Sequence, residues 1–214
     1  MNIAKLLLVA GALSLGGHIA TAQSVPVVNK LPKLDLGIKI GGNFAQLGGN
    51  GWEQTYKPGI TSGAFIGLHK HKIGLQAEVL LNTSHYTTKG LVDSVNKGDF
   101  RALYLDIPVL FEYKLIGAKL APKVWLQAGP QFSTLMSVKN LNDYKGDAKS
   151  AFKSSTASLV LGAEMRYLKF VLGARYIIGL TDVNNTGSVN GLVSYGTDKW
   201  NNKSYQLYIG FKFI

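Results

Sequence analysis

The sequence predicts an all-β protein, an eight-stranded antiparallel up-and-down transmembrane β-barrel with short periplasmic turns and long external loops. The chain has 214 residues, 46% hydrophobic and 16% charged, but beyond its N-terminus no apolar run reaches the roughly 18 residues of a membrane helix. Apolar and polar residues alternate with a period of two through most of the chain. Long and short connections follow one another between the alternating segments, as in a membrane barrel.

The N-terminus has the features of a secretory signal peptide. Lys5 precedes an apolar stretch over residues 6–15, and Ala-Thr-Ala follows at 20–22. This is the order of a charged region, an apolar region and a cleavage site. The alternatives are an amphipathic first helix or an uncleaved anchor. We expect three parts: a signal peptide at 1–22, a periplasmic N-terminal segment at 23–33 and the barrel at 34–214.

Eight segments alternate apolar and polar side chains, as strands with one apolar face do. They cover residues 34–44, 60–69, 73–82, 103–113, 124–133, 157–167, 170–180 and 205–213, and the second is the weakest. Their apolar faces, in chain order, are Leu34, Leu36, Ile38, Ile40 and Phe44; Ala64, Ile66 and Leu68; Ile73, Leu75, Ala77, Val79 and Leu81; Leu103, Leu105, Ile107, Val109, Phe111 and Tyr113; Val124, Leu126, Ala128, Pro130 and Phe132; Ala157, Leu159, Leu161, Ala163, Met165 and Tyr167; Phe170, Leu172, Ala174, Tyr176, Ile178 and Leu180; Tyr205, Leu207, Ile209, Phe211 and Phe213.

Two prolines argue locally against this assignment. Pro108 and Pro130 fall inside predicted strands, where each removes a hydrogen bond from the ladder. We expect a β-bulge or a local gap in the strand pairing at these positions.

The connections differ in length in a regular way. Those after the first, third, fifth and seventh strands are long and rich in Gly, Asn, Asp, Ser and Lys, at 46–57, 87–100, 139–153 and 183–203. Those at 69–72 and 168–169 are short, and the one at 114–123 is intermediate. This sorting predicts that the long loops share one end of the barrel, which is the external end in outer-membrane barrels.

The alternation also fits a soluble barrel with an apolar interior. The polar face, however, is mostly Gly, Gln and Ser, too weakly charged to form a soluble surface. Aromatic residues near the strand ends match the girdles of a membrane barrel; they are Tyr113, Tyr167, Phe170, Tyr205 and Phe213.

Composition excludes several other classes. The chain has no cysteine, so it has no disulfide framework, zinc ribbon or thiol nucleophile. Its formal charge of +11 would suggest nucleic acid, but only three of the 23 basic residues are arginine and none forms a basic run. With a secretory signal as well, we expect no nucleic-acid partner.

The chain resembles the PorT-like family of Bacteroidetes outer-membrane β-barrels, small barrels similar in architecture to OmpX and the OmpA barrel. The resemblance covers about residues 34–214 and rests on the segments GIKIGGN at 37–43, LQAEVLL at 75–81, LDIPVLFEY at 105–113, QAGP at 127–130, ARYIIGLTD at 174–182 and YIGFKFI at 208–214. It implies an outer-membrane location. The PorT branch is associated with export of secreted proteins, so the resemblance also implies an envelope role.

Seven charged residues have the parity of the lumen and lie at similar heights near the short-turn end. They are Lys39, Glu78, Glu112, Glu164, Arg166, Arg175 and Lys212. An eight-stranded barrel is only wide enough for side chains to fill it, so we expect these residues to form a structural ion network that packs the lumen, together with Gln76, Gln127 and Tyr104. The functional alternative is a proton or ion path, or a gate.

Within this network we expect Arg175 to bond Glu164. The two lie on consecutive strands joined by the turn at Leu168-Lys169, and Glu164 is the diagonal neighbour of Arg175. Glu112 or Glu78 would complete the group across the lumen.

Metal and catalytic sites find little support. His69 and His71 flank a short turn without nearby acidic residues, which predicts a solvated turn and no metal site. His85 has lipid-face parity, whereas its neighbour Ser84 points to the other side, and no G-x-S-x-G motif is present. We therefore expect no enzyme, no catalytic residue and no cofactor.

The functional hypothesis is an integral outer-membrane barrel with a packed, non-conducting lumen that acts through its loops or turns in envelope assembly or export. The alternatives are a narrow pore for small ions or solutes and, third, a lipid-modifying enzyme. We expect a monomer that contacts outer-membrane lipids and lipopolysaccharide, with envelope or secretion-machinery proteins as further partners. The loop lysines would form a cationic rim toward anionic phosphates or an acidic partner; they are Lys89, Lys97, Lys139, Lys145, Lys149, Lys153, Lys199 and Lys203. Simple loop solvation is the alternative, since Asp93, Asp99, Asp143, Asp147 and Asp198 are interleaved with them.

Overall fold

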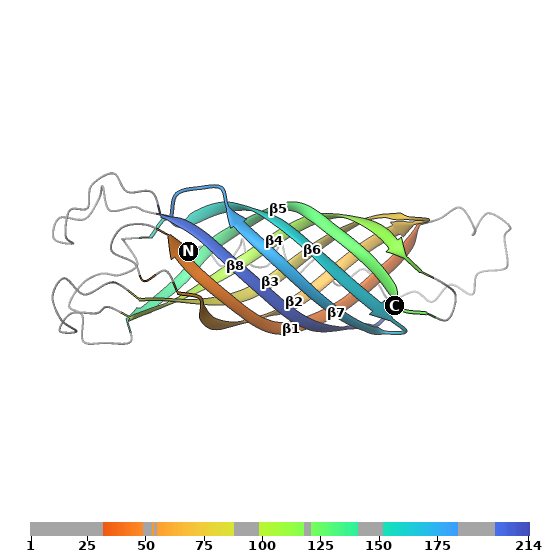
Figure 1. The fold of residues 1–214 in the computed structure, drawn as a ribbon, viewed down its shortest axis with the longest axis horizontal. Helices are drawn as coiled ribbons and strands as arrows, with labels where there is room; N and C mark the ends of the chain where they lie inside the picture. Colours follow the sequence, from red (N-terminus) through yellow and green to blue (C-terminus); the bar gives the residue numbers. More distant parts are fainter. Residues whose placement is uncertain are drawn as a thin grey trace, which may run out of the picture. The chain divides into compact units, whose positions relative to one another are not determined.

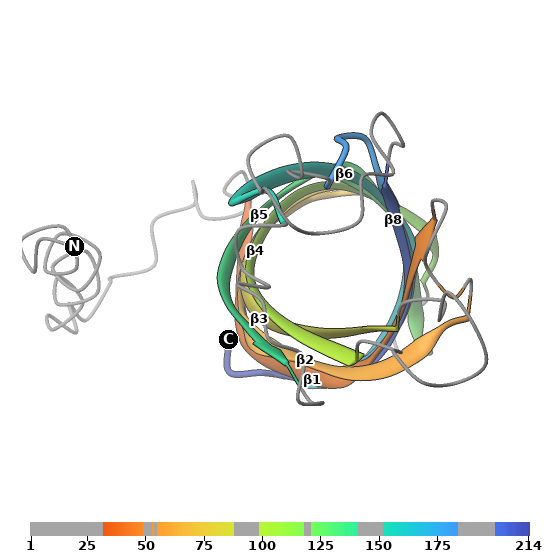
Figure 2. The ribbon, with the colours of Figure 1, turned by 90° about the vertical axis from the view of Figure 1, so that its left-hand side faces the viewer.

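The computed structural model describes residues 32–48, 53, 55–87, 99–117, 121–140, 152–183 and 200–214. These residues form a closed antiparallel barrel in which each strand pairs with the next along the chain and β8 pairs with β1 (Figures 1 and 2). The strands are β1 (Lys33–Gly48), β2 (Lys57–Lys70), β3 (Ile73–Thr87), β4 (Asp99–Ile116), β5 (Lys123–Asn140), β6 (Ser155–Tyr167), β7 (Phe170–Gly179) and β8 (Asn201–Lys212). The fold class predicted from the alternation is therefore confirmed. The predicted signal peptide at 1–22 lies outside the described residues.

The period of two separates an apolar outer face from the lumen. Ile40, Phe132 and Leu207 are more than half exposed on the outside, whereas Gln76 and Glu112 are fully buried inside. This is the reverse of a soluble barrel and is the arrangement of a protein surrounded by lipid. Within the described residues, no helix combines the length and the apolar character required to cross a membrane.

Most strands extend further than the alternation predicts. The segment predicted at 124–133, for example, is part of β5, which runs from Lys123 to Asn140. Hydrophobic alternation marks only the part of a strand whose outer face is apolar. The ladder continues beyond it because backbone groups still need hydrogen-bond partners.

The two strand prolines are accommodated by local gaps in the pairing. Between β3 and β4, pairing stops after Ala77–Val109 and resumes in the same register at Leu80–Asp106, which leaves out Pro108. Between β4 and β5, it likewise skips Pro130. Of the two expected solutions, the structure uses the gap at both prolines, and the β4–β5 register shifts lie elsewhere.

The lumen is packed in three layers. Charged side chains fill the short-turn end, and polar residues such as Asn43, Asn82 and Asp106 lie in the middle. The long-loop end is filled by an apolar plug of Ala45, Leu47, Tyr86, Phe100, Ala102, Tyr104, Leu135, Phe152, Val183 and Trp200. The sequence does not predict this plug, because several of its residues fall in segments predicted as loops.

Two tight turns join strands at the short-turn end. His71 and Leu168 begin these turns with φ of 59° and 54°, in the left-handed region that few non-glycine residues adopt. The turns bring the ends of β2 and β3, and of β6 and β7, together beside the charged layer.

Candidate functional site in the barrel lumen

The charged layer draws on all eight strands. Lys39 comes from β1, His69 from β2, Glu78 from β3 and Glu112 from β4, and all are buried. The other buried members are Gln76, Gln127, Glu164, Arg166, Arg175 and Tyr208. They share one face because each occupies an inward position of its strand, and the register of neighbouring strands sets them at similar heights.

Glu78 is one centre of the network. Arg175 donates to both of its oxygens, from Nη2 to Oε1 at 2.5 Å and from Nη1 to Oε2 at 2.7 Å. Lys39 Nζ donates to Oε1 at 2.9 Å, and Gln76 Nε2 at 2.7 Å. The bidentate guanidinium and the two further donors compensate Glu78 for the loss of solvation on burial. An isolated carboxylate in the lumen would have no such compensation.

Arg166 is the second centre and bridges two other acids. Its Nε donates to Glu164 Oε1 at 2.6 Å and its Nη2 to Glu112 Oε1 at 2.7 Å. Its Nη2 also donates to Gln76 Oε1 at 3.1 Å, which connects it with the first centre. The guanidinium lies 5.0 Å from the centroid of the Trp125 ring, so its face is covered by an aromatic side chain.

Gln127 and Tyr208 join the two centres. Gln127 Nε2 donates to Glu112 Oε1 at 2.5 Å and to Glu164 Oε2 at 3.0 Å, while its Oε1 accepts from Arg175 Nε at 3.1 Å. The Tyr208 hydroxyl donates to Glu164 Oε2 at 2.9 Å. An amide is the suitable bridge here, because it offers both donors to the acids and an acceptor to the arginine.

Toward the barrel mouth the network continues through Asp35. Its carboxylate lies 3.0 Å from Lys212 Nζ, 3.5 Å from Arg166 Nη1 and 3.2 Å from His69 Nδ1. His69 Nε2 contacts Glu112 Oε2, and its ring lies edge-on to Trp125. The Lys212 side chain is 18% exposed, so the outermost pair reaches solvent.

The charges of this layer balance. Four carboxylates (Asp35, Glu78, Glu112 and Glu164) face four permanent cations (Lys39, Arg166, Arg175 and Lys212), with His69 between them. The side chains of Glu78, Glu112 and Glu164 have no exposed surface. Such an arrangement fills this end of the lumen with mutually paired charges. No group of three His, Cys, Asp or Glu side chains in the described part of the chain is arranged to hold a metal ion.

Six of the seven charged residues singled out from the sequence lie together in the layer, and Lys212 lies at its edge, bonded to Asp35. The pairing expected for Arg175 was wrong in its main partner. Arg175 does face Gly162 across the β6–β7 hairpin, but its guanidinium extends to Glu78 and stays 4.0 Å from Glu164. The oxygens of Glu164 are instead held by Arg166 and Tyr208.

Three members were missed by the sequence reasoning. His69 was assigned to a solvated turn, yet it is only 6% exposed and belongs to the network, while His71 occupies the turn and is exposed. Asp35 and Tyr208 were passed over. Each shares inward parity with a recognised lumen residue on its own strand, so parity was the signal that could have found them. Tyr104, expected beside the charges, lies in the apolar plug at the other end.

The sequence neighbours Ser84 and His85 are divided by the barrel wall. Ser84 is buried in the lumen and accepts a hydrogen bond from Asn43 Nδ2 at 3.2 Å. His85 lies on the outer face, bonded to Pro58 and Arg101. The two side chains therefore do not form a nucleophile and base pair.

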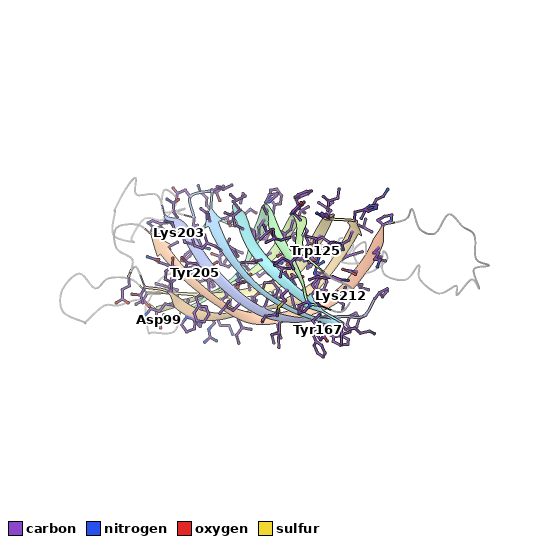
Figure 3. All side chains as sticks on the ribbon, turned by 45° about the vertical axis from the view of Figure 1, so that its right-hand side comes forward. Asp99, Trp125, Tyr167, Lys203, Tyr205 and Lys212 are labelled. Atoms are coloured by element: carbon purple, nitrogen blue, oxygen red, sulfur yellow. The ribbon has the colours of Figure 1, made fainter. Side chains whose placement is uncertain are left out.

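The lysine rim is only partly covered by the described residues. Lys89, Lys97, Lys145, Lys149 and Lys199 lie outside them, as do Asp93, Asp143, Asp147 and Asp198. Lys139 and Lys203 are exposed at the long-loop ends of β5 and β8, and Lys153 is half-buried before β6. In Figure 3, Asp99, Lys203 and Tyr205 lie toward one end of the barrel, and Trp125, Tyr167 and Lys212 toward the other.

Comparison with known proteins agrees with this architecture. The structure is similar to that of the outer membrane protein OprG from Pseudomonas aeruginosa, with 16% identity, a TM-score of 0.54, and coverage of 86% of this chain and 97% of that chain. It is also similar to Ail of Yersinia pestis, solved in complex with the heparin analogue sucrose octasulfate, with 12% identity, a TM-score of 0.45, and coverage of 85% and 99%. At 16% identity the likeness to OprG concerns the fold alone. No curated protein matches the sequence.

A family model adds evidence from the sequence itself. The model of the outer membrane protein beta-barrel domain matches residues 21–185, which is well over half of the chain. The match begins before β1 and ends after β7, so it covers the strands from β1 to β7 and most of the charged layer. The chain is therefore an outer-membrane protein that belongs to the outer membrane β-barrel domain family.

Proposed function

We propose that the protein is a closed, non-conducting outer-membrane barrel that acts by presenting its loops, turns or N-terminal segment to partners in envelope assembly or export. The single observation that carries this proposal is that the lumen is filled at both ends. The ion network occupies the short-turn end, and the apolar plug occupies the long-loop end. In a barrel filled in this way, the surfaces that can bind a partner are the outer wall, the loops and the turns.

The two closures differ in chemistry, which makes them independent obstacles. Opening the short-turn end requires that buried ion pairs such as Arg175–Glu78 be separated, and an unpaired buried charge is costly. Opening the long-loop end requires that aromatic side chains such as Phe152 and Trp200 leave the plug. A single change in pH or salt therefore does not weaken the ion network and the apolar plug equally.

Planar-bilayer recording tests the closed lumen. We expect the refolded wild-type protein to give no current steps, with a general porin in the same bilayer as positive control. Variants with one end weakened, Trp200→Ala or Arg166→Ala/Glu112→Ala, should also remain silent, whereas the combination should conduct. Steady wild-type channels would overturn the proposal.

A narrow pore is the second candidate, and one observation favours it. Between the two closures lie buried polar atoms that have no hydrogen-bond partner among the described residues, namely Asn43 Oδ1, Thr61 Oγ1, Asn82 Oδ1 and Gln206 Nε2. Such atoms in a polar interior are the usual partners of buried water. Water in the middle layer would shorten the part of the lumen that has to open before an ion can pass. Wild-type conductance in the bilayer experiment would support this function.

The resemblance to PorT-like barrels supports the export variant of the proposal. It predicts that partners belong to the secretion machinery. Cross-linking in intact cells, followed by purification of the barrel from its native membrane, should recover envelope proteins specifically. As a control, the same purification from cells that express a barrel with its external loops shortened should lose partners that bind the loops.

A further inference from the structure

The outer face of the barrel carries a row of three basic side chains on adjacent strands. His85 on β3 pairs directly with Arg101 on β4, and Arg101 pairs directly with Lys139 on β5. All three point away from the lumen, since their neighbours Tyr86, Ala102 and Val138 belong to or pack against the apolar plug. We call His85, Arg101 and Lys139 the basic row.

A hydrogen-bond relay orients the arginine of this row. Arg101 Nε donates to His85 Nε2 at 2.6 Å, so Nε2 of the imidazole acts as an acceptor. The proton of the neutral ring is then on Nδ1, which donates to the Pro58 carbonyl at 2.5 Å. Because Nε of Arg101 is used in this bond, its two Nη groups remain without a partner among the described residues.

The cationic groups of the row have no anionic partner among the described residues. Arg101 and Lys139 are both exposed, and no ion pair joins either of them to a described carboxylate. The described acid on the same stretch of β4 is Asp99, one step further toward the loops, and it accepts from Thr87 Oγ1 at 3.4 Å. Two cations side by side repel each other, so this arrangement is best stabilised by an anion that bridges them.

The height of the row on the wall points to the kind of anion. Toward the short-turn end, the outer faces of the same strands become apolar, with Leu81, Ile107 and Phe132 each more than 40% exposed. The row therefore lies where the apolar band ends and the loops begin, which is the level of lipid headgroups. A guanidinium fork beside an ammonium group matches the oxygens of a phosphate.

The row occupies one sector of this end of the barrel. Around the other side, Tyr176 and Tyr205 stack at 4.7 Å between ring centroids, and Tyr56 packs on Tyr205 at 5.1 Å. Tyrosines of this kind suit a membrane interface without selecting a charge. Lys203 lies on that side as a single exposed lysine whose strand neighbours are Gln46 and Ile178. Within the part of the chain that the structure describes, a two-cation site at this level is thus a local feature of β3, β4 and β5.

From these observations we propose that the basic row is a binding site for the phosphate group of a membrane lipid, with Arg101 and Lys139 as ligands and His85 as the positioning residue. The site goes beyond the proposed function, because it concerns the outer wall and holds whether or not the lumen conducts. It would hold one lipid beside β3, β4 and β5.

Native mass spectrometry of the full-length protein in a non-ionic detergent tests the site. The probes are lipid A that carries its phosphates and the same lipid after phosphatase treatment. We expect the wild type to bind the phosphorylated lipid more tightly, and Arg101→Gln/Lys139→Gln to weaken this binding by about 25-fold, taking about fivefold for each cation. Binding of the dephosphorylated lipid should not change.

The matched control is Lys70→Gln/Lys72→Gln, which removes the same charge from the exposed turn at the opposite end. It should keep the wild-type preference. Lys203→Gln, at the same end as the row, should keep it as well. His85→Leu should reduce the preference and His85→Gln should restore part of it, since a glutamine can both accept and donate; a merely structural role for His85 would leave the difference between the two lipids unchanged.

Three results would overturn the proposal. Equal binding of both lipids to the wild type would show that phosphate is not recognised. Retention of the preference in the double variant would place the site elsewhere. Displacement of the lipid by millimolar inorganic phosphate would indicate a site for a free anion. If the double variant does not fold, Arg101→Lys and Lys139→Gln alone provide the test, with an expected loss of about fivefold for the second.

Discussion

Arg175 and Glu78, 97 residues apart in the sequence, form a bidentate ion pair across the lumen from β7 to β3. The pairing of β1 with β8 closes the barrel, so opposite walls are separated by the width of the lumen. Side chains from opposite walls therefore meet only when both are long and point inward at the same height. The pair therefore braces the barrel between strands that share no backbone hydrogen bonds.

The first prediction concerns this brace. Arg175→Met leaves Glu78 with Lys39 as its remaining cation partner, and loss of one partner of a buried pair typically costs about 3–5 kcal/mol. Arg175→Met/Glu78→Gln should recover part of the loss, and Arg175→Met/Glu164→Gln less, because Arg175 stays 4.0 Å from Glu164. The midpoint of urea unfolding in detergent, followed by the heat-modifiable gel shift, measures all three. Additive losses in the first double variant would show that Arg175 and Glu78 do not act as a pair.

The second prediction concerns a glycine that makes room for Tyr208. A Cβ at Gly173 would overlap the Tyr208 ring and hydroxyl, which donates to Glu164. Gly173→Ala should therefore displace the tyrosine and cost about 1–3 kcal/mol, as overpacking does. Gly48→Ala is the control, since its Cβ would approach the Asn201 carbonyl at an ordinary 3.5 Å. Equal unfolding midpoints for the two variants would contradict the close packing of Tyr208.

Sequence periodicity predicted much more of this barrel than of its interior contacts. Alternation and loop lengths are local properties, so they identified the strands, their order and the inward parity of Glu78, Arg166 and Arg175. The ion-pair partners inside the lumen depend on the height of each residue, which the strand register sets. They also depend on which of several long side chains occupies each carboxylate. Arg175 thus extends to Glu78 because Glu164 is already held by Arg166 and Tyr208.

The apolar plug was missed for a related reason. Phe152 and Trp200 come from segments rich in loop residues, where no period of two reports their direction. His69 was missed because its position next to a turn was given more weight than its parity. Inward parity continues to the last residue of a strand, so residues beside turns can still be buried.

The third prediction concerns strain in the β6–β7 turn. Leu168 has a φ of 54°, a conformation that costs a non-glycine L-residue about 1–2 kcal/mol and that asparagine tolerates better. Its side chain is 77% exposed, so little packing is lost on substitution. Leu168→Asn should stabilise the barrel by about 1 kcal/mol in the urea experiment. Lys72→Asn, at a turn position without positive φ, should leave the midpoint unchanged, and a stabilisation of the same size there would argue against relief of strain.

The last prediction compares two buried acids that differ in their surroundings. Glu78 is held by Lys39 and Arg175, whereas Asp106 in the middle layer has no ion pair with any described residue. Its carboxylate accepts from Asn82 Nδ2 at 2.9 Å, and Ser133 lies opposite in the β4–β5 register. A buried charge without a cation is unfavourable, so Asp106→Asn should stabilise the barrel near neutral pH by about 1–2 kcal/mol. The same change of acid to amide at Glu78 should destabilise it by about 3 kcal/mol, because Arg175 and Lys39 then lack their carboxylate. Urea midpoints of the two variants check the opposite signs, and a loss of stability in Asp106→Asn similar to that in Glu78→Gln would show that the middle layer supplies a compensating charge to Asp106.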